Sequence, residues 1–417
     1  MTGTVRQWIT RAQPGTLAAV AALVQGAASH AILIVGPPAV GKTTLADDLA
    51  AGLLCLAADS ADRPCRVCRG CRLAAAGNHP DLHRLGPDGP GGQVVIGESG
   101  RPAVRGVRNL VAELAYLPVE GGHRVAIVEH AERMNEDAQN ALLKTLEEPG
   151  DGVTLILCAD DEDRLLPTVR SRCVRLRVAP LGIRSIEELL GDRGVADSVT
   201  AARLARLAAG RPGLALTYAR VPEAVTIHDE IARILLDLLG AARSARLVAG
   251  RELIERAAAL ETALRPAIVP GGPVARVPRR AARAGGAAGA TPEPEVSPGA
   301  GDGDPAIEAQ QPGKRTPAER RRAVMLLLEI WQDVARDLAI AGLGGRREVR
   351  DPALLDDLVA VAASVPPAEV GGFLAQLDRV AELVEGNTGP ELALDVLVLA
   401  WPRAIRAATG HPGRHLS

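Results

Sequence analysis

The residues Gly36-Pro37-Pro38-Ala39-Val40-Gly41-Lys42-Thr43 fit the phosphate-binding pattern G-x-x-x-x-G-K-[ST] at every position. The apolar run 31–35 precedes them, and leucines at helical spacing follow from Lys42 to Leu56. A buried strand, a glycine-rich loop and a helix in this order are the context that the pattern requires. A chain that contains such a loop is expected to build an α/β core around it.

Further strand and helix signals support a parallel sheet. Val125–Val128 and Thr154–Ala159 are predicted to be buried strands, and residues 135–148 between them form a helical pattern that Pro149 ends. Strands that alternate with helices favour a parallel α/β sheet. After Arg177 the strand signals fade and the pattern is helical. We therefore predict an α/β P-loop domain with a parallel sheet, followed by an all-α C-terminal region.

The loop predicts a nucleotide site. Its backbone N–H groups and the following helix N-terminus favour phosphate oxygens. Lys42 would reach the β- and γ-phosphates, and Thr43 would ligate Mg²⁺. ATP or ADP with Mg²⁺ is the expected ligand, and the expected binding residues are Gly36, Pro37, Pro38, Gly41, Lys42, Thr43 and Thr44.

The second strand argues against an efficient hydrolase. A P-loop hydrolase needs an Asp at the end of this strand, usually followed by Glu. Here Glu129 takes the first position, where it could still support Mg²⁺, and His130 takes the second. We expect nucleotide binding with little or no intrinsic ATPase activity. The alternative is that Glu132 supplies the missing carboxylate from a shifted register.

Four cysteines predict a metal site. Cys55, Cys65, Cys68 and Cys71 form the spacing C-x₉-C-x₂-C-x₂-C, which suits a closed, structural Zn²⁺ site with four thiolates. Arginines interleave with them and would offset the negative charge. The alternatives are a disulfide pair, unliganded thiols, or His79 or His83 in place of one Cys ligand. Cys158 and Cys173 lie in apolar runs and are expected to be core residues.

Composition limits the partners. The 417-residue chain has 48 Lys and Arg against 50 Asp and Glu, a net charge of −2, so it is not a basic nucleic-acid binder as a whole. Its six aromatic residues are scattered, which argues against stacking platforms for single strands. No long uncharged apolar run predicts a membrane span. A cytoplasmic protein with reduced cysteines is expected.

The segment 266–317 differs from the rest of the chain in its composition. Ten Pro and nine Gly among its 52 residues predict disorder. Its first half is basic and its second half is acidic. A solvated linker is the main interpretation, and a basic arm that touches DNA is the alternative.

Several stretches in a fixed order resemble one family. After the phosphate-binding loop and the cysteine cluster come residues 77–81 (GNHPD), 139–149 (QNALLKTLEEP) and 171–173 (SRC). Together they resemble the clamp-loader subunits of bacterial DNA polymerase III, which are AAA+ ATPases. The resemblance is strong over residues 31–225, and residues 387–394 weakly resemble the last helix of the collar domain. The sequence around Glu129 and residues 165–173 resemble the delta-prime type, and Asp160 stands near the position where the gamma/tau motor has a small polar residue.

The resemblance implies a function and further site residues. A delta-prime subunit helps to hold the clamp-loader ring and to load the sliding clamp onto primed DNA, with gamma/tau and delta subunits as partners, in the cytoplasmic replisome. It is part of a nucleotidyltransferase complex. Arg172 would be an arginine finger that completes the ATPase site of a neighbouring subunit, and an intrachain salt bridge is the alternative. Arg211 would be the sensor-2 residue at bound phosphate, and a plain helix-capping turn is the alternative.

The implied domains are an AAA+ domain over 1–178 with the zinc module 55–71, a lid over 179–225, and a collar over 226–417 that contains the segment 266–317. Two other functions stay open at this point. One is a motor ATPase of the gamma/tau type, and the other is a zinc-dependent DNA-binding P-loop ATPase.

Overall fold

A parallel sheet forms the centre of the N-terminal part. The computed structural model describes residues 8–11, 13–26, 29–87, 93–97, 105–120, 122–268, 315–385 and 389–404. Its five strands are β1 (Ala31–Val35), β2 (Leu82–Leu85), β3 (Arg124–Val128), β4 (Val153–Ala159) and β5 (Val174–Arg177). They pair in the order β2-β3-β4-β1-β5, and every pair is parallel. The predicted α/β fold class is confirmed.

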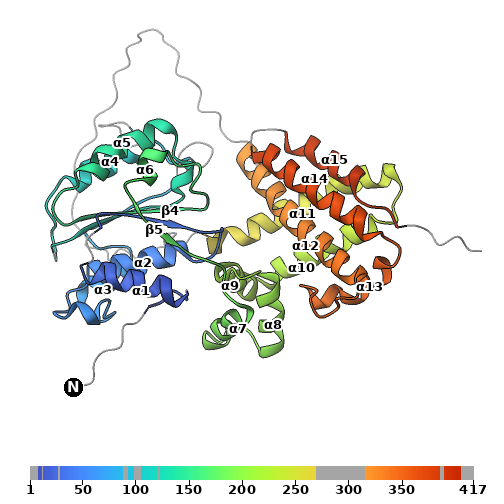
Figure 1. The fold of residues 1–417 in the computed structure, drawn as a ribbon, viewed down its shortest axis with the longest axis horizontal. Helices are drawn as coiled ribbons and strands as arrows, with labels where there is room; N and C mark the ends of the chain where they lie inside the picture. Colours follow the sequence, from blue (N-terminus) through green and yellow to red (C-terminus); the bar gives the residue numbers. More distant parts are fainter. Residues whose placement is uncertain are drawn as a thin grey trace, which may run out of the picture.

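Helices cover both faces of the sheet (Figure 1). On one face lie α1 (Pro14–Val24), α2 (Lys42–Leu53) and α3 (Arg69–Ala75), and on the other lie α4 (Val107–Leu114), α5 (Glu136–Glu147) and α6 (Pro167–Arg170). Because β1, β3 and β4 are buried on both faces, their apolar side chains alternate between two separate hydrophobic clusters.

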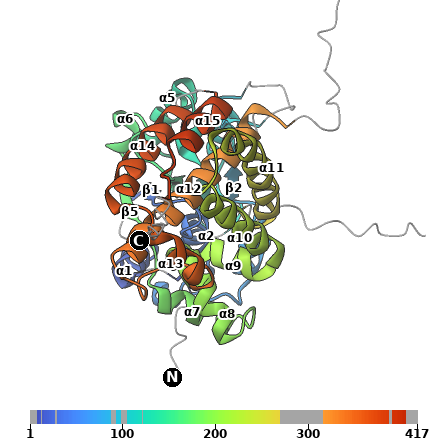
Figure 2. The same ribbon diagram turned by 90° about the vertical axis from the view of Figure 1, so that its right-hand side faces the viewer.

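The remaining helices follow β5 and form the C-terminal part. They are α7 (Ile183–Asp192), α8 (Ser198–Leu207), α9 (Pro212–Arg220), α10 (Pro222–Asp237), α11 (Arg243–Ile268), α12 (Pro317–Gly342), α13 (Leu355–Ala362), α14 (Pro367–Glu385) and α15 (Pro390–Ala400). Figure 2 turns this part toward the viewer. Trp331, Phe373 and Trp401 meet in its interior, with ring centroids 4.7–5.6 Å apart.

One hydrophobic cluster runs through all of these helices, from Ile186 to Trp401. The lid helices therefore share a core with the collar helices, and the domain boundaries at 178 and 225 stay a proposal. No helix in the described ranges is both long and apolar enough to cross a membrane.

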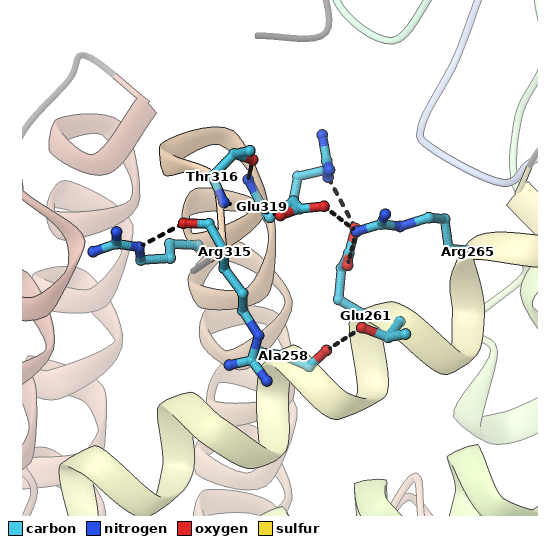
Figure 3. A network of polar contacts seen from close by, with 9 residues as sticks. Ala258, Glu261, Arg265, Arg315, Thr316 and Glu319 are labelled. Atoms are coloured by element: carbon cyan, nitrogen blue, oxygen red, sulfur yellow. Dashed lines mark hydrogen bonds and ion pairs between the residues drawn. The ribbon is translucent and has the colours of Figure 1, made fainter. Parts of the chain in front are cut away.

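Polar contacts join α11 and α12 on either side of the Pro- and Gly-rich segment (Figure 3). Arg265 pairs with Glu261 of its own helix at 2.9 Å and with Glu319 of α12 at 3.0 Å. Thr316 and Glu319 form a reciprocal capping box at the start of α12. The helices reach slightly into the segment predicted to be disordered, because α11 continues to Ile268. Residues 269–314 lie outside the described residues.

Candidate nucleotide and metal sites

Two glycines shape the phosphate-binding loop between β1 and α2. A Cβ on Gly36 would lie 2.2 Å from the carbonyl oxygen of Val178, so only glycine fits there. Gly41 has φ +103°, in the left-handed region, directly before the first residue of α2. The loop thus places Lys42 at the helix N-terminus, as the sequence pattern predicts.

The ammonium group of Lys42 is buried and has three acceptors within its own chain. Its Nζ donates to the carbonyl oxygens of Gly36 and Pro37, at 2.7 Å each. It also forms an ion pair with Asp160 Oδ1 at 2.5 Å. An ammonium has three donors, so all of them are engaged. A phosphate group would have to compete with these acceptors.

The sheet explains why Asp160 reaches Lys42. β1 and β4 are neighbours, and Val35 pairs with Ala159, so the residues after both strands meet at one edge. The amide of Gly36 also donates to the carbonyl oxygen of Ala159, at 3.3 Å. Sequence reasoning noted Asp160 only as a departure from the family pattern. Its place at the end of a buried strand was the signal that could have identified it as a site residue.

Glu129, at the end of β3, is paired with an arginine. Its Oε1 lies 3.2 Å from Nη1 of Arg84, whose other nitrogen pairs with Asp47 of α2. Burial raises the pKa of Glu129, although Arg84 opposes this effect. Glu129 therefore sits close to α2 with its charge already matched.

His130 and Glu132 lie close to Asp160. His130 Nδ1 is 3.1 Å from Glu132 Oε1 and 3.7 Å from Asp160 Oδ2, and the amide of Asp160 donates to Glu132 Oε2 at 3.2 Å. Glu132, which was considered as the source of the missing carboxylate, thus lies next to Asp160 at the edge of the loop. Glu132 is nearly buried and is held by these contacts.

A small cavity lies beside the contact between the loop and the lid. Its volume is about 80 Å³, and its lining includes Thr10, Gly41, Thr44, Pro212 and Gly213. The amide of Gly213, in α9, donates to the carbonyl oxygen of Ala39 in the loop at 3.0 Å. Lid and loop are therefore in direct contact beside the predicted nucleotide site.

The four predicted cysteines come together between α2 and α3. Their sulfur atoms lie within 4.8 Å of one another, and Cys55 Sγ and Cys68 Sγ are 3.9 Å apart. Four sulfurs bound to one Zn²⁺ at ~2.3 Å would lie about 3.8 Å apart. None of the six cysteines forms a disulfide. The cluster therefore has the donor set and the spacing of a metal site.

Backbone amides point at these sulfurs, as expected for thiolates. The amides of Cys65, Cys68 and Cys71 donate to the sulfurs of Cys55, Cys65 and Cys68, at 3.4 Å each. Burial raises the pKa of Cys68, but N–H groups outweigh it and lower the value to about 7. Burial instead raises the pKa of Cys55 and Cys71, so among these three thiols only Cys68 ionises more readily than usual.

The two histidines considered as replacement ligands are engaged elsewhere. His79 is buried and accepts a hydrogen bond from the amide of Asp81 at 3.1 Å. His83 Nδ1 lies 2.8 Å from Glu113 Oε2. The metal-compatible group at this place consists of the four cysteines alone.

Arg172 lies on the surface just after α6. Its Nη1 donates to the carbonyl oxygen of Thr168 at 2.9 Å, and its Nη2 pairs with Glu147 of α5. The salt bridge considered as an alternative role is thus present. Both side chains remain at least one-third exposed, so the guanidinium is accessible from outside.

Arg211 precedes α9 but contacts α12. Its Nη1 lies 2.7 Å from Glu329 Oε2, and its Nε donates to the carbonyl oxygen of Ala208 at 3.2 Å. Its described side-chain contacts thus reach Ala208 of the lid and Glu329 of the collar, and none of them reaches the phosphate-binding loop.

Comparison with known proteins finds similar sequences for the N-terminal part of the chain. Residues 16–182 match the family model described as DNA polymerase III, delta subunit. The DNA polymerase III subunit delta' of Pseudomonas aeruginosa is 43% identical over 148 residues, which cover 35% of this chain and 42% of the relative. The delta' subunit of Escherichia coli is 35% identical over 210 residues, or 50% of this chain and 60% of the relative.

The tau subunit of Escherichia coli is also similar, with 34% identity over 199 residues that cover 46% of this chain and 29% of the relative. The chain thus spans only about half the length of the delta' relatives that it matches. Over residues 16–182, this chain is thus similar to the delta' subunits of DNA polymerase III.

Proposed function

We propose that this chain is the delta-prime-type subunit of a bacterial clamp loader. It joins gamma/tau and delta subunits in a ring, and the ring places the sliding clamp on primed DNA. In this role Arg172 completes the ATPase site of a neighbouring subunit. A guanidinium near the γ-phosphate neutralises the charge that develops as the phosphoryl group leaves.

One observation carries the choice of a non-motor subunit. The carboxylates around the phosphate-binding loop are already engaged: Asp160 with Lys42, and Glu129 with Arg84. A hydrolase needs a carboxylate that holds Mg²⁺ and another group that orients the attacking water. A loop in this state supports nucleotide binding better than turnover.

Two cofactors belong to the proposal. Mg²⁺ with ATP or ADP would be held by the loop residues, with Lys42 on the phosphates and Thr43 on the metal. Zn²⁺ would be held by Cys55, Cys65, Cys68 and Cys71, and it would link the end of α2 to α3 without taking part in chemistry. The cysteine spacing and the N–H···S bonds support the second assignment.

The experiment that tests the function is co-purification with the native partners, followed by composition analysis and ATPase assays. We expect a complex with gamma/tau and delta subunits, and negligible ATPase activity of the isolated chain. Turnover of about 1 s⁻¹ or more by the isolated chain, typical of working enzymes, and its loss in a Lys42→Ala control, would instead identify a motor.

The motor is the second candidate because the similarity extends to a tau subunit and because Glu132 lies beside Asp160. The same ATPase measurement with Glu132→Gln separates the two functions. A motor that uses Glu132 loses its turnover, whereas a delta-prime subunit has none to lose.

A further inference from the structure

Asp48 is a fully buried carboxylate on α2, away from the phosphate contacts of Lys42. Its Oδ1 accepts a hydrogen bond from the amide of Ile9 at 3.2 Å, and its Oδ2 accepts one from the amide of Thr10 at 2.7 Å. Oδ1 also pairs with the guanidinium of Arg66. A buried carboxylate is stable only when such charged and polar partners replace water. The two amides and the guanidinium are therefore necessary to keep the ionised Asp48 buried.

The partners of Asp48 belong to two different sites. Ile9 and Thr10 line the small cavity beside the phosphate-binding loop, together with Gly41 and Thr44. Arg66 lies between Cys65 and Cys68 in the cysteine cluster. One carboxylate thus connects the metal-compatible cluster to the wall of the predicted nucleotide site.

The backbone of Arg66 depends on its surroundings. Its φ is +61°, a left-handed conformation that costs energy for any residue other than glycine. Such a conformation persists only when neighbouring contacts hold it. A metal bound by Cys65 and Cys68 would fix the chain on both sides of Arg66. Loss of the metal would remove that restraint.

We propose that Asp48 is a positioning residue that couples metal binding at the four cysteines to nucleotide binding at the loop. The inference rests on the proposed function, because it needs both ligands. With Zn²⁺ bound, Arg66 stays on Asp48, and Asp48 holds Ile9 and Thr10 against the cavity. Without Zn²⁺, Arg66 moves away, and the buried carboxylate keeps only the two amides. The N-terminal segment then loosens, and nucleotide binds more weakly.

The test is calorimetric titration of the full chain with MgADP, in the zinc-loaded form and after removal of zinc by a chelator. We expect zinc to tighten ADP binding on the order of tenfold, within the range of typical coupling between sites. Coupling is reciprocal, so ADP should raise the affinity for zinc by the same factor. Zinc affinity is measured by competition with a chromophoric chelator.

Arg66→Ala is the decisive variant because Arg66 is not a ligand. This variant should keep one zinc, yet its affinity for ADP should no longer depend on zinc. Arg66→Lys should restore part of the dependence, since an ammonium can still pair with Asp48. Arg69→Ala is the matched control. Arg69 also lies within the cysteine cluster, but it pairs with Glu120 at 3.0 Å, so the ADP affinity of this variant should still depend on zinc.

Each outcome has a distinct meaning. Equal ADP affinity with and without zinc in the unmodified chain overturns the coupling and leaves the proposed function standing. A zinc dependence that survives in Arg66→Ala overturns the role of Asp48. If neither form binds ADP, the inference and the nucleotide part of the proposed function are both wrong.

Discussion

Lys42 and Asp160 show how one side chain can set the affinity of a phosphate-binding loop. Only 8% of the lysine side chain and 22% of the aspartate side chain are exposed, so water screens their attraction weakly. An incoming phosphate must take the place of this carboxylate. The pair therefore makes the loop a weaker anion site than its sequence suggests.

The first prediction is that Asp160→Asn raises the affinity for MgADP by about tenfold, which corresponds to ~1.4 kcal/mol. The amide can still accept a hydrogen bond from Lys42 but no longer neutralises it. Isothermal titration measures the change. Asp161→Asn is the control, because the half-exposed side chain of Asp161 pairs with Arg164. The affinity of this variant for MgADP should not change. Weaker binding by Asp160→Asn would show that Asp160 helps to hold the ligand.

The second prediction concerns Arg172. Arg172→Ala should leave folding and ring assembly nearly unchanged, because the exposed pair with Glu147 contributes at most about 1 kcal/mol. The ATPase activity of the reconstituted ring should fall, although less than the ~10³–10⁵ of a single completed site, because other subunits supply their own fingers. Arg172→Lys should not rescue it, since an ammonium lacks the planar pair of donors.

Arg170→Ala serves as the control for Arg172, because Arg170, the last residue of α6, lies two positions away and pairs with Asp163 at 2.6 Å. Both variants are assayed for melting temperature and ring ATPase. A destabilised Arg172→Ala monomer with full ring ATPase would leave Arg172 with a structural role only.

At the residue scale, sequence patterns predicted those site residues whose roles depend on short spacings along the chain. The loop glycines, Lys42 and the four cysteines are set by short spacings, so the sequence revealed them. The partners of Asp160 and Arg211 could not be predicted in this way. Lys42 lies 118 positions from Asp160, and Arg211 lies 118 positions from Glu329, so only the fold brings them together.

At the scale of elements, the cysteine cluster joins the end of α2 to α3. The third prediction is that the purified chain carries about one Zn²⁺ and that Cys68→Ser loses it, because three thiolates hold the metal more weakly than four. Metal analysis of reduced protein measures this. Cys173→Ser, outside the cluster, should keep its zinc. A metal content near zero in the unmodified protein would contradict the assignment.

The fourth prediction concerns the segment between α11 and α12. Replacing residues 270–313 by a Gly/Ser linker of about 11 residues should leave the melting temperature unchanged or slightly higher. The contacts of Arg265 and Arg315 keep the two helix ends together, and shortening a loop fourfold lowers its closure cost by about 1.2 kcal/mol. Thermal unfolding measures the effect.

Thr316→Ala is the comparison variant for this deletion. It removes the capping bond and should destabilise the protein by about 1 kcal/mol. A deletion that unfolds the helical part, while Thr316→Ala does not, would show that the segment itself contributes to the core.

The strands show where element prediction ends. β1 is entirely apolar, and β3 and β4 each contain one polar residue, Arg124 and Thr154. All three strands were predicted, because a central strand that is buried on both faces is rich in apolar residues. β2 (Leu82–Leu85) contains His83, which lies beside Glu113, and Arg84, which pairs with Asp47 and Glu129. β5 (Val174–Arg177) is an edge strand with two arginines. Their polar side chains hide the strand pattern, and only the tertiary ion pairs explain them.

At the scale of the molecule, the hydrophobic clusters divide the chain into a sheet-centred part and a helical part. The fifth prediction is that these parts unfold separately and that zinc removal destabilises only the first. Trp331 and Trp401 lie in the helical cluster, whereas Trp8 packs against the cluster under the sheet. In Trp8→Phe, tryptophan fluorescence therefore follows the helical part alone.

The measurement compares this fluorescence with far-ultraviolet circular dichroism during thermal unfolding. A chelator should lower the midpoint temperature of a transition seen by circular dichroism. The midpoint temperature seen by fluorescence should not change. One coincident transition that shifts as a whole would mean that the contacts between the lid and the loop make the molecule a single cooperative unit.

The small cavity under the lid has a kinetic consequence. Sites for small molecules usually measure about 300–1,000 Å³, whereas this one holds about 80 Å³. Beside it, the hydrogen bond from the amide of Gly213 to the carbonyl oxygen of Ala39 holds α9 against the loop. If the proposed nucleotide occupies this cavity, we expect it to enter only after the lid helices have moved away from the loop. The observed rate constant for nucleotide binding should then rise with nucleotide concentration and level off. The plateau should equal the rate constant for lid opening.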